Sequence, residues 1–77
     1  MKRLTAAQAQ ALAVRAAMEA QLTWMAAEQV PENDPGYMEA MSRWTEAAAV
    51  DVPEGDYCLF MNTHEAPIAY IREPEAS

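Results

Sequence analysis

The positions of proline and glycine constrain this chain more than any other feature. Residues 6–29 contain neither, whereas two short segments, 31–36 and 53–55, hold five of the seven prolines and glycines. Proline lacks a backbone N–H donor and disfavours a helical residue before it, so each segment interrupts regular structure. The sequence therefore predicts a helix over residues 6–29, a second helix over residues 35–50 and a change of structure after residue 56.

Capping residues mark the start of both predicted helices. Thr5 and Gln8 have the spacing of a capping box, in which the Thr5 hydroxyl accepts from the Gln8 amide and the Gln8 side chain accepts from the Thr5 amide. Asp34 followed by Pro35 resembles an N-cap with proline at the first helical position. We expect the two helices to form an antiparallel hairpin.

The first helix carries two apolar surfaces. One stripe recurs at steps of three and four residues and is expected to face a core. Its members are Leu4, Ala7, Ala11, Val14, Met18, Leu22 and Met25. The opposite side is a strip of small residues with Trp24 at its edge, made of Ala9, Ala13, Ala16, Ala20 and Ala27. Two interpretations of the strip stay open: alanine stabilises an exposed helix, or the strip is a second packing face for a homodimer or a target.

The second helix has a single apolar face. It consists of Tyr37, Ala40, Met41, Trp44, Ala47 and Ala48. Met41 is expected in the core, whereas Met38 points away from this face and is a candidate for recognition. Trp44 is expected to be buried between helix and sheet, where the change Trp44→Ala would cost about 3–5 kcal/mol.

The last part of the chain is predicted to form an antiparallel β-hairpin. Residues 57–62 and 67–72 alternate in the manner of strands, with residues 62–67 as their connection and residues 73–77 as a polar tail. Both faces of both strands carry apolar residues, and the helices of one chain can cover only one face. The other face or an open strand edge is therefore a candidate for pairing with a second molecule. The predicted fold class is α+β, with the order α-α-β-β in one small domain spanning residues 1–77.

The charge of the chain is strongly acidic and unevenly distributed. Twelve acidic residues against five basic residues give a net charge of −7. Eleven of the acids lie in residues 28–77, where only Arg43 and Arg72 are basic. Direct binding of nucleic acid is disfavoured, because phosphate binding needs clustered lysine and arginine. A protein partner with a basic surface is expected instead. The candidate partner-binding residues are Glu32, Asp34, Met38, Glu39, Glu46, Asp51, Glu54 and Asp56.

Residues with catalytic chemistry are few. The only histidine, His64, falls in the predicted hairpin turn, and the only cysteine, Cys58, falls in an alternating strand where it resembles a small apolar filler. One histidine and one cysteine do not supply a set of zinc ligands, and no glycine-rich phosphate loop is present. We expect a protein that is not an enzyme and that has no cofactor and no metal.

Size and targeting features favour a small protein of the cytoplasm. No segment approaches the roughly 20 apolar residues that span a bilayer, so no membrane contact is expected. Gln8, Gln10 and Arg15 interrupt the stretch that would form the apolar part of a signal peptide. The single cysteine forms no internal disulfide, which also fits an intracellular compartment.

Two functional hypotheses follow. The first is a non-catalytic protein-binding protein, such as the inhibitors that phages and mobile elements direct against host nucleic-acid machinery, anti-CRISPR proteins included, acting as an acidic decoy or a steric blocker. The second is a homo-oligomeric regulatory or structural subunit, such as an antitoxin-like partner. The distinguishing property is where the spare apolar surface is used, and a strictly monomeric protein would weaken the second hypothesis.

Overall fold

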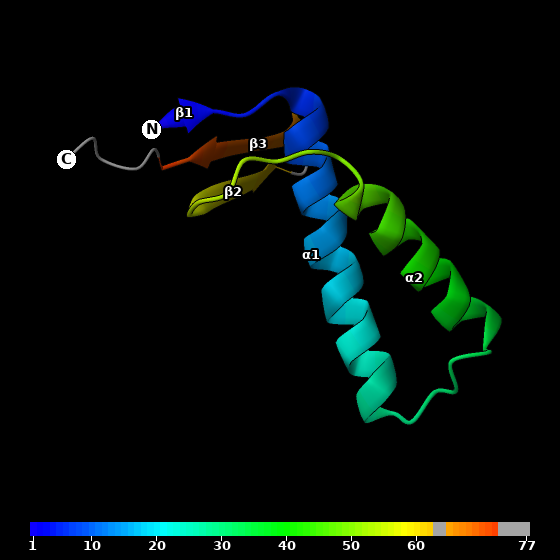
Figure 1. The fold of residues 1–77 in the computed structure, drawn as a ribbon. Coiled ribbons are helices and arrows are strands. Elements are labelled where there is room, and N and C mark those ends of the chain that lie inside the picture. The colour runs from blue at the N-terminus through cyan, green and yellow to red at the C-terminus, as the bar shows by residue number, and fades with distance from the viewer. Residues whose placement is uncertain (63–64, 73–77) are drawn as a thin grey trace.

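The computed structural model describes residues 1–62 and 65–72 and has an α+β fold. In chain order the elements are β1 (Lys2–Arg3), α1 (Ala6–Ala27), α2 (Pro35–Ala48), β2 (Tyr57–Asn62) and β3 (Glu65–Ile71). The two helices form the expected antiparallel hairpin, and the strands form one antiparallel sheet beside α1 (Figure 1). The fold class is confirmed, with a third strand that the sequence did not indicate. The predicted tail 73–77 and residue His64 lie outside the described residues.

Helix α1 begins where the sequence places it. Thr5 N donates to Gln8 Oε1 over 3.0 Å and Gln8 N donates to Thr5 Oγ1 over 3.1 Å, which confirms the capping box. The helix ends at Ala27, two residues before the predicted end, because Gln29 adopts a φ of 60° that a right-handed helix does not allow. The amide of Val30 then bonds to the carbonyl of Met25 over 2.9 Å and closes the last turn.

Helix α2 also begins as predicted. The Asp34 carboxylate accepts from the amides of Gly36 and Tyr37, at 2.9 and 3.3 Å, with Pro35 at the first helical position. The helix ends at Ala48 and not at the predicted residue 50, with Ala49 as its C-cap. In the described residues α2 contacts α1 and no strand, so the helical hairpin does not cover the sheet as one layer.

The sheet has the strand order β1-β3-β2, which places β3 in the middle. Strand β1 pairs with β3 through Lys2 opposite Ile71 and Arg3 opposite Tyr70, and Leu4 N donates to Ala69 O over 2.9 Å. Two residues are too few to produce an alternating pattern, so this strand could not be predicted from the sequence. The N-terminus therefore completes the sheet, and the predicted two-stranded hairpin is corrected to three strands.

Strand β3 begins at Glu65 and ends at Ile71, which shifts the predicted strand 67–72 toward the N-terminus. Pro67 therefore lies inside the strand and not in the connection. Between the pairs of Phe60 with Ile68 and of Asn62 with Glu65 the register shifts by one residue, so that Ala66 and Pro67 of β3 lie opposite Met61 of β2. Proline is tolerated at such a bulge, and on the β1 side the chain has already entered α1. Strand β2 has its predicted bounds, with a register shift between Phe60 and Asn62.

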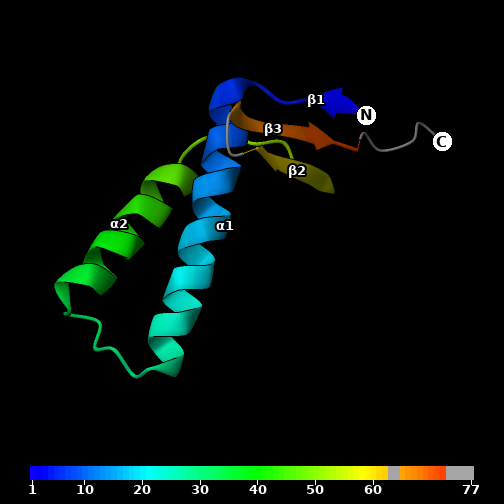
Figure 2. The same cartoon turned by 180° about the vertical axis from the view of Figure 1, so that it is seen from behind.

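The core lies between α1 and the sheet. It contains Leu4, Ala9, Leu12, Ala69 and Ile71, with the partly buried Val52 and Leu59 packed against it. Helix α1 therefore lies in the middle, with the sheet on one side and α2 on the other (Figures 1 and 2). Ala9 and Ala13 of the alanine strip are buried, whereas Ala16, Ala20 and Ala27 are exposed. The strip is therefore buried in its first half, where Ala9 belongs to the cluster that joins α1 to the sheet.

The predicted core stripe of α1 is mostly confirmed against α2. Ala11, Met18 and Met25 are buried and Val14 and Leu22 are half-buried. Ala7 is exposed and lines an open depression with Ala47 and Val50, where the end of α2 approaches the start of α1. The packing of α1 on both sides thus depends on alanines that let the neighbouring elements approach closely.

Candidate functional site

The outward face of α2 carries exposed methionines beside acidic residues. Met38 is 59% exposed and Met41 is 39% exposed. Both side chains line a shallow depression with Glu32, Tyr37, Ser42 and Thr45. We call the face formed by Glu32, Met38, Met41, Glu39 and Glu46 the α2 surface. Adaptable apolar side chains with carboxylates beside them suit a partner that is basic and partly apolar.

Met41 is exposed, although the sequence predicted it in the core. Successive residues of a helix are rotated by about 100°, which places Met41 between the inward-facing Trp44 and the outward-facing Met38. The helical period alone therefore did not predict whether Met41 is buried. Met38 is exposed as expected. The spacing of Met38 and Met41 could have predicted that both belong to one apolar surface, because residues i and i+3 are neighbours on a helix.

The acidic candidates on α2 differ in their roles. Glu39 and Glu46 are exposed about 80–100° around the helix from Met38, on the flank away from Met41, and Glu46 lines a separate depression with Arg43 and residues of α1. Asp34 is half-buried, and its carboxylate accepts two backbone amides of its own helix. Asp34 therefore caps the N-terminus of α2. Its charge adds to the negative potential there, but its carboxylate is already engaged by the two amides. Glu32 is exposed in the connection that precedes it.

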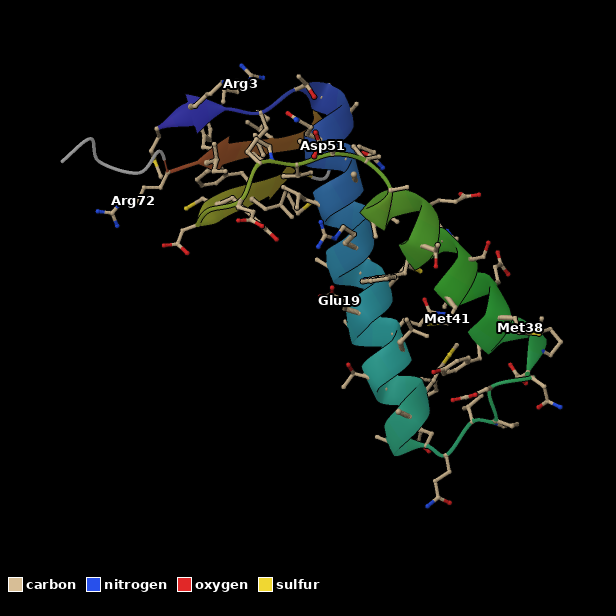
Figure 3. The ribbon with its side chains drawn as sticks, in the orientation of Figure 1. Arg3, Glu19, Met38, Met41, Asp51 and Arg72 are labelled. Atoms are coloured by element: carbon tan, nitrogen blue, oxygen red, sulfur yellow. The ribbon has the colours of Figure 1, made fainter. Side chains whose placement is uncertain are left out.

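The remaining candidates, Asp51, Glu54 and Asp56, are exposed in the segment between α2 and β2. Met38 lies at the start of α2 and Asp51 beyond its end, at opposite ends of the helix (Figure 3). Fourteen helical residues separate these ends by about 21 Å. The eight predicted residues therefore form two groups. Only the group on and before α2 includes an exposed apolar side chain, that of Met38.

Basic residues lie at the sheet. Arg3 and Arg72 are exposed there, far from Met38 (Figure 3). The segments that build the sheet, residues 1–4 and 56–72, contain three basic and two acidic residues, whereas residues 5–55 contain two basic and eight acidic residues. The negative potential therefore belongs to the helical hairpin and its connections.

Trp44 joins the two helices and does not lie against the sheet, which corrects the expected environment. Its ring is half-buried, and Nε1 donates to Glu19 Oε1 over 3.1 Å. Trp44 and Glu19 also line an apolar groove with Leu22, Thr23 and Met41. The cause is the arrangement of the layers, since α1 separates α2 from the strands (Figure 1).

This environment lowers the expected effect of Trp44→Ala to about 1–2 kcal/mol, because a partly solvated ring loses less on truncation than a fully buried one. The measurement is the free energy of unfolding by urea, followed by far-UV circular dichroism so that the lost fluorophore does not affect the signal. A loss of 3–5 kcal/mol would instead support burial of the ring between helix and sheet.

Groups with catalytic potential do not converge in the described residues. Cys58 is exposed on β2, and His64 lies outside the described residues. Within residues 1–62 and 65–72, no group of three or more histidine, cysteine or carboxylate side chains is placed to hold a metal ion. No polar or charged side chain is buried in the same part of the chain.

Comparisons with known proteins give no further identification. No family model matches this chain, and no curated protein and no solved structure matches it either. Among the helices of the described residues, none has the length and apolar character needed to cross a membrane.

Proposed function

We propose that this chain is a non-catalytic protein-binding protein whose α2 surface contacts a basic region of a protein partner. The observation that carries the proposal is the exposure of Met38 and Met41 in one shallow depression with Glu32. Isolated acidic residues on a surface are ordinary, but large apolar side chains at its centre lose contact with water when a partner covers them. The carboxylates of Glu39 and Glu46 then supply long-range attraction and orientation.

The finer proposal concerns the kind of partner. A surface that is negative and compact can occupy a basic groove that otherwise receives nucleic acid, as an acidic decoy or a steric blocker. This action is that of a phage or mobile-element inhibitor of host nucleic-acid machinery, of the anti-CRISPR kind, working in the cytoplasm of the host cell. The support is the charge of the helical hairpin together with the small size of the chain.

The test is a pull-down from lysate of the source organism's cells with the immobilised full chain, at about 0.1 M and about 1 M salt, where the Debye length falls from about 10 to about 3 Å. We expect a basic protein that is retained at low salt and released at high salt. Two variants should each abolish its retention: Glu39→Gln with Glu46→Gln, which removes two charges, and Met38→Ser, which leaves the net charge unchanged.

Matched controls separate the α2 surface from general charge and general exposure. Glu54→Gln with Asp56→Asn removes the same number of charges from the other acidic group, and Met61→Ser changes another methionine, 69% exposed, on β2. Both controls should retain the protein. Equal retention by all variants, or retention that depends on Glu54 and Asp56 alone, would contradict the proposed surface.

A second candidate function is supported by the sheet and not by α2. Three of the large exposed apolar residues, Tyr57, Phe60 and Met61, belong to β2. This observation favours a homo-oligomeric regulatory or structural subunit, such as an antitoxin-like partner, in which copies associate through their strands. Sedimentation of the chain alone tests this candidate, because it requires self-association: a monomer would exclude it, whereas a dimer is compatible with both candidates.

A further inference from the structure

Strand β2 is an edge strand without protection against pairing. The opposite edge, β1, is two residues long and carries Lys2 and Arg3, both features that discourage edge pairing. Strand β2 is six residues long and reads Tyr57 to Asn62 without a charge or a proline. The two edges of one sheet thus differ in length and in charge, two of the features that normally prevent a second strand from adding.

The backbone groups at the free edge of β2 follow from the ladder. Arg72 N donates to Asp56 O over 2.7 Å, and Tyr57 lies opposite Ile71. In an antiparallel ladder the bonded positions alternate, so Cys58 and Phe60 bond toward β3. Tyr57 and Leu59 therefore direct their N–H and C=O groups away from β3, where no strand of the described residues pairs with them.

Helix α1 extends beyond this edge. In the described residues it contacts β3 and β2 but not β1, and its second half continues past β2 on the side away from β1 (Figures 1 and 2). Ala16, Ala20 and Ala27 are exposed and continue the same strip as the buried Ala9 and Ala13, of which Ala9 packs in the cluster with Ala69 and Ile71 of β3. The exposed part of the strip, from Ala16 to Ala27, is about 17 Å long, enough to cross about three strands.

We propose that a second copy of this chain pairs its β2 antiparallel to β2, so that two sheets become one continuous six-stranded sheet. A twofold axis normal to the sheet, midway between Leu59 of one copy and Leu59 of the other, keeps both α1 helices on one face. Leu59 then lies opposite Leu59 of the second copy, and Tyr57 lies opposite Met61 of the second copy.

Three features of the chain favour a second copy, and not another protein, as the partner of the β2 edge. The helix surface that already packs on its own sheet continues without a break onto the sheet of the other copy. Tyr57 shares a sheet face with the core residues Leu59 and Ile71 but is 45% exposed, and in the pair it lies under the second half of α1 of the other copy. The sheet is also the part of the chain with little net charge, so two acidic molecules approach there with least repulsion.

The pairing also adds burial that one chain lacks. Among the described residues the core contains no large side chain that is fully buried, and several of its members are alanines. The inference uses β2 and the far half of α1, whereas the proposed binding of a basic partner uses α2. The two proposals therefore fail independently, and a dimer would present two α2 surfaces to a partner.

The experiment is sedimentation equilibrium of the full chain and of two variant pairs at about 10–500 μM. Met61→Lys places a charge at the paired edge, with Met38→Lys as its control on α2. Ala20→Lys places a charge on the exposed strip, with Ala26→Lys as its control elsewhere on α1. We expect dimers for the unmodified chain and both controls, and self-association at least about tenfold weaker for both test variants, because the twofold axis applies each change twice.

Several outcomes would overturn the proposal. A monomeric unmodified chain throughout this range excludes the second copy as the occupant. Equal self-association of each variant and its control places the contact elsewhere. Far-UV circular dichroism and thermal unfolding of each sample establish that it is folded, and Ala20→Lys decides the case if Met61→Lys does not fold, since it alters an exposed helical position only.

Discussion

Replacing Leu12 by alanine should lower the free energy of unfolding by about 3 kcal/mol, the largest effect of any single truncation considered for this chain. Leu12 is 3% exposed and belongs to the cluster that joins α1 to the sheet. Its neighbours Ala9 and Ala69 carry only a methyl group, which cannot rotate into the space left behind. A chain of this size is stable by about 4–12 kcal/mol, so the change removes a large share of its stability.

Leu22→Ala is the matched control for this prediction. Leu22 is also in α1 but is half-buried in the groove toward α2, and its truncation should cost about 1 kcal/mol. Urea unfolding at one fixed protein concentration measures both changes, since self-association would alter apparent stability. Equal losses would show that the contact between helices matters as much as the contact between α1 and the sheet.

Replacing Gly55 by alanine should lower the free energy of unfolding by about 2–3 kcal/mol. Gly55 has a φ of 144°, which L residues avoid. A Cβ atom there would also approach Arg72 O and Ile71 Cδ1 at 3.3 Å, and the carbonyl oxygen belongs to the backbone. The strain would fall beside the bond from Arg72 N to Asp56 O, which starts the β2–β3 ladder. Thermal unfolding followed by circular dichroism should show a midpoint lower by about 10–20 °C.

Gly36→Ala is the control, because it makes the same chemical change at a helical position. Its Cβ would meet Asp34 Oδ2 at 3.1 Å, the end of a side chain, and Met25 Cε at 3.7 Å. Alanine gains about 0.5–1 kcal/mol over glycine in a helix, which offsets the disturbance of the cap, so the net effect should be within about 1 kcal/mol of zero. A similar loss at both glycines would mean that the conformation of Gly55 is not the cause.

The local elements were predictable because their signals are local. Thr5 with Gln8, and Asp34 with Pro35, fix the helix starts through contacts within one turn. The alternation of residues 57–62 likewise gives β2 its bounds. The ends of the helices were predicted two residues too late, because the left-handed Gln29 and the cap at Ala49 leave no composition change at those positions.

The candidate site was predictable in part. The exposure of Met38, Glu39 and Glu46 follows from the helical period. The role of Asp34 as a cap was also predicted, although it was counted as a partner-binding residue as well. The separation of Asp51, Glu54 and Asp56 from the start of α2, and the exposure of Met41, were not, because acidic residues close in sequence can lie at opposite ends of a helix.

The sequence by itself determined the two helices, their caps, the alternating strands and the excess of negative charge in the helical hairpin. The tertiary structure alone decided that α1 lies between α2 and the sheet, that the N-terminus adds a third strand, and which half of the alanine strip is buried. The physical reason is that alternation and helical period state which side of an element is apolar. They do not show which of several apolar surfaces will pack against that side. Whether Ala16 and Ala20 are buried depends on how far a sheet extends along α1.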